Sequence, residues 1–184
     1  MALGEGAALF VIEPFDEAAA RGADVLAEIT GYGAATDGHH LTQPHPEGDA
    51  ALAAMQAACA QAGIGPADID YINSHGTGTP LNDIAEGNAI VRWGGEAVRR
   101  VMVSSTKGAI GHLLGGAGAV EAAICAMALR EGWVPPTANV RDPDPVCAGF
   151  DLVTAPREVP IRRALTNSFG FGGANATLIL EKAP

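Results

Sequence analysis

The sequence predicts a layered α/β fold with a mixed sheet. Short apolar runs alternate along the chain with longer segments of helical periodicity, the pattern of strands that alternate with helices. Two apolar runs near the carboxyl end, 164–168 and 174–181, flank a short turn of Phe and Gly and predict an antiparallel pair. With 184 residues and a hydrophobic fraction of 48%, the chain can form one ordinary domain with its own core.

The first half of the chain is expected to contain three strands and one helix. In order, these are strands at 7–13 and 24–33, a loop at 37–49, a helix at 50–62 and a strand at 69–74. The loop has two prolines, three histidines and no periodicity. In the helix, Leu52, Met55 and Cys59 share one face, and Gly63 marks its end.

The second half continues the alternation of helices and strands. The expected elements are a helix at 80–93, a strand at 101–105, a helix at 116–130, a loop at 135–145 and the antiparallel pair. Pro80 suits the first helical position, with Thr79 as its N-cap. In the helix at 116–130 we expect the apolar stripe to consist of Val120, Ile124 and Met127.

Composition excludes several classes of protein. Lys and Arg number 11 against 21 Asp and Glu, and the net charge of −10 argues against nucleic-acid binding. The three cysteines (Cys59, Cys125 and Cys147) form no CxxC pair and indicate a reducing, cytoplasmic compartment. No basic signal-peptide region is visible, and the apolar stretch 113–129 is too short and polar to span a membrane. We therefore expect a cytoplasmic protein with no nucleic-acid or membrane partner.

Three segments that combine glycines with polar groups each follow a predicted strand, where α/β folds usually bind ligands. They are NSHGTGT at 73–79, KGAIGH at 107–112 and NSFGFGG at 167–173. His75 in the first segment can present a neutral ring that donates an N–H into a cleft. The hydroxyls of Thr77 and Thr79 are placed to bind an amide-bearing arm. Taken alone, His75 is better explained as a histidine in a strand-end turn.

The second segment places Lys107 near His112, where a cation in a poorly solvated site favours the neutral imidazole. Glu121, on the helix that follows, is a candidate partner for Lys107. The alternative interpretation is a surface lysine and a capping histidine. A phosphate-binding loop is excluded because the order GxxxxGK[ST] is absent.

The third segment can offer a backbone N–H to an oxyanion while a phenyl ring gates a pocket. The alternative is a hairpin turn packed with aromatic residues. Three histidines cluster at positions 39, 40 and 45, but neither HExxH nor CxxC accompanies them, and we expect no metal site.

Together the motifs resemble those of the β-ketoacyl-acyl-carrier-protein synthases. NSHGTGTPLND, VSSTKGAIGHLLGGAGAVEAA, VPPT and NSFGFGGANATLIL occur in that family's order and spacing, and GEGAALFVIE resembles the strand that closes its N-terminal half. The resemblance implies the C-terminal half of a thiolase-like fold, a layered α-β-α arrangement with a mixed sheet. Residues 1–34 would be trailing strands of the N-terminal half, and 35–184 the C-terminal domain.

The resemblance implies decarboxylative Claisen condensation of malonyl-acyl carrier protein with an acyl thioester, without a metal or nicotinamide cofactor. The substrate arrives on phosphopantetheine, and the partners are acyl carrier protein and the N-terminal half or a dimer partner. The implied catalytic residues are His75, His112 and Lys107. Thr77, Thr79 and Phe171 would bind substrate, with Glu121, Phe169 and Gly172 in support. Phe171 matches the gating phenylalanine, and 37–42 resembles a second mobile loop.

The nucleophilic cysteine of that family belongs to the half that is missing here. None of the three cysteines has the required small-residue turn before a helix, so we expect none to be the nucleophile. The chain would then be inactive without the other half, poorly soluble or self-associating. A non-catalytic interaction module or relic, and a gene fragment, remain as alternatives. NSFGFGGANATL favours the fatty-acid type, while VPPTANVRDPDP leaves the polyketide type open.

Overall fold

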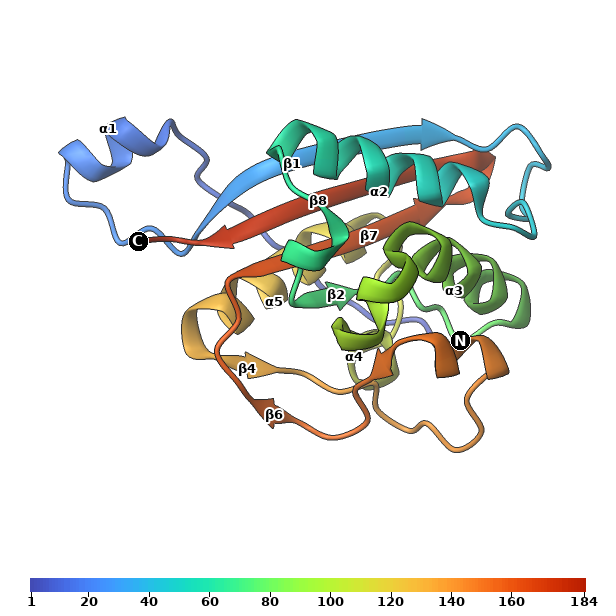
Figure 1. The fold of residues 1–184 in the computed structure, drawn as a ribbon. Helices are drawn as coiled ribbons and strands as arrows, with labels where there is room; N and C mark the ends of the chain where they lie inside the picture. Colours follow the sequence, from blue (N-terminus) through green and yellow to red (C-terminus); the bar gives the residue numbers. More distant parts are fainter.

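The computed structural model describes residues 1–184 and is built around a six-stranded mixed sheet (Figure 1). The strands follow the order β1-β8-β7-β2-β3-β5. Their bounds are β1 (Ala27–Thr36), β2 (Tyr71–Asn73), β3 (Met102–Ser104), β5 (Asp151–Leu152), β7 (Arg163–Gly170) and β8 (Ala174–Lys182). β7, β2, β3 and β5 are mutually parallel, whereas β8 is antiparallel to both of its neighbours. A separate antiparallel pair consists of β4 (Trp133–Val134) and β6 (Arg157–Glu158).

Helices cover both faces of the sheet (Figure 1). The α-helices are α1 (Phe15–Ala20), α2 (Asp49–Ala62), α3 (Pro80–Gly94), α4 (Lys107–Ile110) and α5 (Ala117–Glu131). Short 3₁₀ turns lie at Pro66–Asp68, Gly95–Arg100, Leu114–Gly116, Pro145–Gly149 and Phe171–Gly173. α2 and α3 lie on one face and α5 on the other. None of these helices has the length and apolar character needed to cross a membrane.

The alternation of side chains along the central strands produces two cores. Ile72 and Leu165 point toward α2 and α3, where Met55 and other apolar residues surround them. Their neighbours Tyr71 and Ala164 point the other way, into a second core against α5. The sheet is therefore buried on both faces at its centre, which holds the carboxyl ends of β2, β3 and β7 in fixed positions.

Most of the expected elements are confirmed. The helix at 50–62, the strands at 69–74 and 101–105 and the antiparallel pair at the carboxyl end all form, with small shifts at their ends. The strand expected at 24–33 lies three residues later, because its pairing with β8 continues to Thr36. The domain boundary expected after residue 34 falls inside this strand and stays a prediction. Thr79 occupies the N-cap position of α3 as expected, but its side chain makes no capping hydrogen bond, and its Oγ1 lies 2.8 Å from Thr77 Oγ1.

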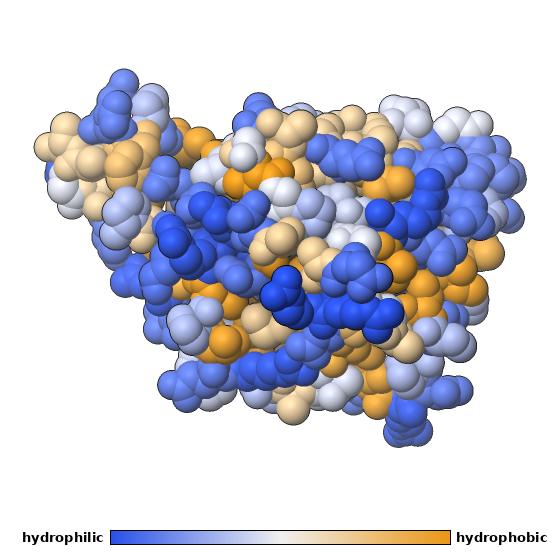
Figure 2. Space-filling model, viewed as in Figure 1, coloured by the Kyte–Doolittle hydropathy of each residue, from blue (hydrophilic) through white to orange (hydrophobic).

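The strand expected at 7–13 is not formed. Residues 5–13 make no backbone hydrogen bond, and Leu9 and Val11 are 99% and 88% exposed. An apolar run becomes a strand only beside another strand, and the chain offers none here. Figure 2 shows the lobe that contains α1, which follows this run, standing away from the body with apolar residues at its surface.

The prediction of which residues form the apolar stripe of α5 is also wrong. Met127 is 44% exposed and Ile124 only partly buried, whereas Ala122, Cys125 and Leu129 face the sheet. The helix is apolar on nearly every side, so periodicity has little contrast, and small residues let it lie close to the sheet. The short elements α1, α4, β4, β5 and β6 were not predicted, because six residues or fewer carry no clear periodicity.

Candidate active site

Three loops converge at one edge of the sheet. β2 leads into the segment that carries His75, the parallel neighbour β3 leads into α4 and His112, and β7 leads into the turn at Phe171–Gly173. Because β2, β3 and β7 run parallel, their carboxyl ends lie side by side. The fold thus brings together the three motifs that are far apart in the sequence.

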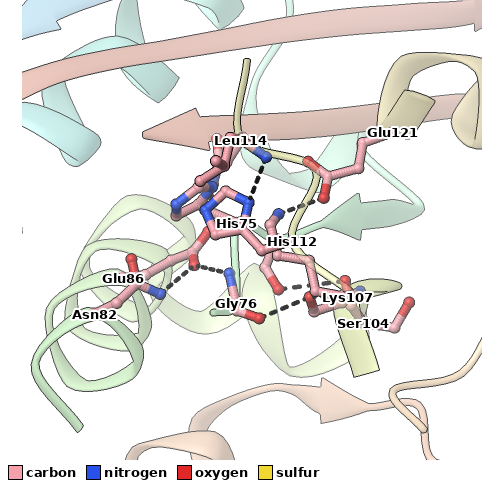
Figure 3. A network of polar contacts seen from close by, with 12 residues as sticks. His75, Gly76, Asn82, Glu86, Ser104, Lys107, His112, Leu114 and Glu121 are labelled. Atoms are coloured by element: carbon pink, nitrogen blue, oxygen red, sulfur yellow. Dashed lines mark hydrogen bonds and ion pairs between the residues drawn. The ribbon is translucent and has the colours of Figure 1, made fainter. Parts of the chain in front are cut away.

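Two imidazoles lie next to each other, edge to face, where these loops meet (Figure 3). The ring centroids of His75 and His112 lie 5.3 Å apart with an interplanar angle of 82°. The ring of Phe169 lies 5.4 Å from that of His75. His75 is buried and His112 is partly exposed, so the pair reaches from the interior toward solvent.

Both imidazoles are held in the neutral form. Burial, with smaller contributions from the positive charge of Lys107 and from His112, lowers the pKa of His75 to about 3. Burial also lowers the pKa of His112, again with a contribution from Lys107. The backbone N–H of Leu114 donates to His112 Nδ1 at 3.2 Å, so the ring proton of neutral His112 resides on Nε2. Leu114 makes this contact with a φ of 52°, which is rare for a leucine.

Lys107 forms a buried ion pair with Glu121, as the sequence predicted. Both side chains are almost fully buried, between α4 and α5 (Figure 3). Burial raises the pKa of Glu121 to about 7, although Lys107 acts in the opposite direction. No hydrogen bond joins Lys107 to either imidazole, so its effect on the histidines is electrostatic.

The residues expected to bind substrate line one cavity of about 650 Å³, which we name the histidine cavity. Its walls include His75, His112, Thr77, Thr79, Phe169 and Phe171. Phe171 is 81% exposed at the rim. Lys107, Glu121 and Gly172 lie outside this lining. A larger cavity of about 850 Å³ shares Thr77 and Thr79 with the histidine cavity but is lined by neither imidazole, so the candidate site is the smaller one.

The two loops expected to move together are joined by backbone hydrogen bonds. The N–H of Gly172 donates to the Leu41 carbonyl at 2.7 Å, and the N–H of Asp37 donates to the Gly173 carbonyl at 2.7 Å. The Asp37 carboxylate in turn accepts the backbone N–H of His45. A displacement of the turn that carries Phe171 would therefore disturb the loop at 37–42.

The sequence motifs did not identify Glu86 as a residue of the site. Its buried carboxylate accepts the backbone N–H groups of His75 and Gly76, each at 2.8 Å (Figure 3). It also accepts the side-chain amide of Asn167 at 3.2 Å. Burial raises the pKa of Glu86 against these hydrogen bonds. A signal was present in the sequence: Glu86 occupies the apolar face of α3 together with Ala85, Ala89 and Ile90, where a carboxylate needs partners.

No cysteine lines the histidine cavity. Cys59 and Cys125 are buried in α2 and α5, and Cys147 lies in the 3₁₀ turn at Pro145–Gly149. Burial raises the pKa of all three thiols, the opposite of what activates a nucleophile. The described residues also hold no group of three or more His, Cys, Asp or Glu side chains arranged for a metal ion.

Solved structures that share this thiolase-like fold include ketosynthases. The chain superposes on the ishigamide ketosynthase/chain length factor with a TM-score of 0.92 and 38% identity, covering 99% of this chain and 44% of that one. It matches a type II PKS ketosynthase, solved in complex with its acyl-carrier protein, with a TM-score of 0.89 and 32% identity, covering 94% and 42%.

A family model described as "Beta-ketoacyl synthase, C-terminal domain" matches residues 26–141. The chain is 47% identical over 183 residues to the 3-oxoacyl-[acyl-carrier-protein] synthase 2 of Staphylococcus aureus (strain COL), covering 98% of this chain and 44% of that protein. The enzyme of the same name from Rhizobium meliloti (strain 1021) is 49% identical over 181 residues, covering 98% and 42%. The chain belongs to the β-ketoacyl synthase family, and it spans less than half the length of these relatives.

Proposed function

We propose that the chain supplies the C-terminal half of the active site of a 3-oxoacyl-acyl-carrier-protein synthase. The observation that carries the proposal is the pair of neutral imidazoles, 5.3 Å apart, at the wall of the histidine cavity. Two neutral rings offer N–H donors to one oxygen without adding positive charge. Such a pair suits the enolate that forms when a malonyl thioester loses carbon dioxide.

The reaction at this site has two steps, decarboxylation and condensation. The bond to the malonyl carboxylate breaks, carbon dioxide leaves, and the electron pair passes to the thioester, where His75 and His112 donate to the oxygen. The α-carbon then attacks an acyl thioester held on a cysteine of the other half, and the cysteine thiolate leaves. Removing one such donor typically costs about 10²–10³-fold in rate. The chemistry requires no metal or nicotinamide cofactor, because the protein's own N–H groups stabilise the charge.

The remaining residues have supporting roles in the proposal. The charge of Lys107, which is fixed by Glu121, adds to the effect of burial and further lowers the pKa of both imidazoles. Thr77 and Thr79 face the cavity, where they would bind the phosphopantetheine arm of acyl carrier protein. Phe171 at the rim would gate entry, with Phe169 against His75 and Gly172 tied to the loop at 37–42.

The partners of the chain are part of the proposal. We expect it to need an N-terminal half that carries the cysteine, and to be inactive alone, because no cysteine lines the histidine cavity. The relatives named synthase 2 favour fatty acid synthesis over polyketide synthesis. A cytoplasmic location stays a prediction from the sparse, unpaired cysteines.

The test combines the chain with the cysteine-bearing N-terminal half of the Staphylococcus aureus relative. Carbon dioxide release from malonyl-acyl carrier protein and the condensation product are both measured. We expect activity only in the complex, and a loss of about 10²–10³-fold with His112→Ala. His45→Ala is the matched control, because its ring does not line the cavity. A well-folded complex without condensation would contradict the proposal and favour a non-catalytic interaction module.

A further inference from the structure

We propose that residues 1–4, which we name the bridge segment, position His112 through main-chain hydrogen bonds. The consequence for catalysis rests on the proposed function above, but the positioning itself does not. The backbone N–H of His112 donates to the Ala2 carbonyl at 2.8 Å, and the N–H of Gly4 donates to the His112 carbonyl at 3.0 Å. Leu3 and His112 thus form an isolated parallel β-bridge.

Few other contacts hold the backbone at His112, where the bridge segment binds. His112 follows the end of α4 and precedes the short turn at Leu114–Gly116, so no helix or long strand holds its backbone. Both main-chain polar groups of His112 are used by the bridge segment. His75 is different, because its loop is fastened by Glu86 from α3. The two imidazoles of the pair are therefore held by two independent parts of the molecule.

Main-chain contact, and not side-chain burial, keeps the bridge segment in place. Met1 and Leu3 are 67% and 70% exposed, and residues 5–13 add no backbone hydrogen bond. The approach is close because two glycines meet. A Cβ on Gly4 would lie 2.1 Å from the Ile110 carbonyl oxygen, and one on Gly111, whose φ is +78°, would lie 2.7 Å from the Gly4 nitrogen. Any side chain at position 4 must therefore lift the segment away from His112.

The position of His112 determines what its ring can do. With the backbone in place, Leu114 donates to Nδ1, and the Nε2 proton is available to the cavity beside His75. If the bridge opens, this hydrogen bond and the 5.3 Å spacing of the rings lose their support. The bridge segment is a positioning element, because it acts on the reacting groups only through His112.

The primary test is nuclear magnetic resonance of the histidine side chains in the ¹⁵N-labelled full chain. In the unmodified chain we expect His112 as a single Nε2–H tautomer, with an Overhauser contact to the His75 ring. In Gly4→Ala we expect a mixed tautomer and loss of that contact, with His39, His40 and His45 unchanged. Gly65→Ala is the matched control, because a Cβ there meets only the Asp68 side chain at 3.9 Å.

A second variant, shortened to begin at Glu5, removes the bridge without adding a Cβ. It should reproduce the His112 changes, with far-UV circular dichroism like that of the full chain. Retention of the Nε2–H tautomer and the ring contact in this variant overturns the proposal. Unfolding of both variants also overturns it, because the segment would then support the whole fold and not His112.

An activity measurement separates this inference from the proposed function. In the complex with an N-terminal half, Gly4→Ala should lower kcat by about 10²-fold, as for loss of one donor, with KM little changed. Changes at His112 in the spectra together with an inactive unmodified complex would leave the positioning intact and refute the proposed function. An active complex whose kcat is unaffected by Gly4→Ala would refute the inference alone.

Discussion

The carboxylate of Glu86, on α3, accepts the backbone N–H of His75 at 2.8 Å and so ties the His75 loop to this helix. The same carboxylate accepts the N–H of Gly76 at 2.8 Å. Two adjacent main-chain donors therefore depend on one buried side chain. Their position, and with it the direction of the His75 ring, should be sensitive to small changes at Glu86.

Replacing Glu86 with glutamine tests this dependence. Glutamine has one acceptor oxygen, so one of the two buried N–H groups loses its partner. We expect Glu86→Gln to lower the free energy of unfolding by about 1–3 kcal/mol in urea titrations. The control is Glu96→Gln, whose side chain is 97% exposed and which should change the free energy by less than about 0.5 kcal/mol. Equal effects of the two substitutions would contradict the role given to Glu86.

Lys107→Met tests the electrostatic effect on the two imidazoles. Lys107 lowers the pKa of His75 and of His112, so removal of its charge should raise both, although burial keeps them below 6.5. Titration of the ring signals by nuclear magnetic resonance measures the change directly. Arg99→Met, at an exposed position, is the control and should leave both values unchanged. Unchanged values in Lys107→Met would show that burial alone keeps the rings neutral.

The Lys107–Glu121 pair should behave as a unit in stability measurements. Removing one partner leaves an uncompensated buried group, which costs about 3–5 kcal/mol for typical buried pairs. We expect Lys107→Met combined with Glu121→Leu to be less destabilised than Lys107→Met alone. Urea unfolding of the two single variants and the double variant gives the coupling free energy. Strictly additive losses would mean that the two groups stabilise the fold independently.

Acid should destabilise the chain in part through His75. Its pKa is lowered in the folded chain to about 3 from 6.5, so between these values the unfolded chain binds the additional proton. The stability contributed by neutral His75 is therefore present above pH 6.5 and is lost as the pH falls toward 3. The free energy of unfolding of His75→Gln, relative to the unmodified chain, should rise between pH 7 and pH 4. A pH-independent difference for His75→Gln would contradict the assignment.

The exposed run at 7–13 should cause self-association. Leu9 and Val11 are almost fully exposed, and the unpaired backbone beside them can pair with another chain. Sedimentation velocity should show concentration-dependent association that Leu9→Lys with Val11→Lys abolishes. Leu41→Lys removes an exposed leucine elsewhere and should leave the association unchanged. A chain that stays monomeric at all concentrations would exclude this segment as an association site.

Much of the candidate site could be predicted from the sequence because its residues lie in short motifs. His75, His112 and Phe171 each lie in a glycine-containing motif that follows a strand, and parallel neighbours bring such motifs to one edge. The contact between Lys107 and Glu121 was predictable because a lysine buried beside a helix needs a carboxylate. These features follow from residue type and order along the chain.

Other features depend on contacts between distant segments. Glu86 acts on His75 across two elements, and its role is visible only as hydrogen bonds to main-chain groups. The bridge between Leu3 and His112 is made by backbone atoms only. Leu3 is 70% exposed, and no side chain in this segment marks the contact in the sequence. The prediction of a strand at 7–13 was wrong because a strand needs a neighbouring strand to pair with, and propensity alone does not supply one.

The bridge at Leu3 has a practical consequence for dividing a ketosynthase into two polypeptides. A cut placed after Gly4 would assign His112 to one product and its main-chain support to the other, so every reassembly would have to rebuild a two-bond contact. A polypeptide that includes the whole bridge segment keeps both on the same molecule. Split-enzyme biosensors and assembly-controlled synthases built on this scaffold should therefore be cut before the bridge segment.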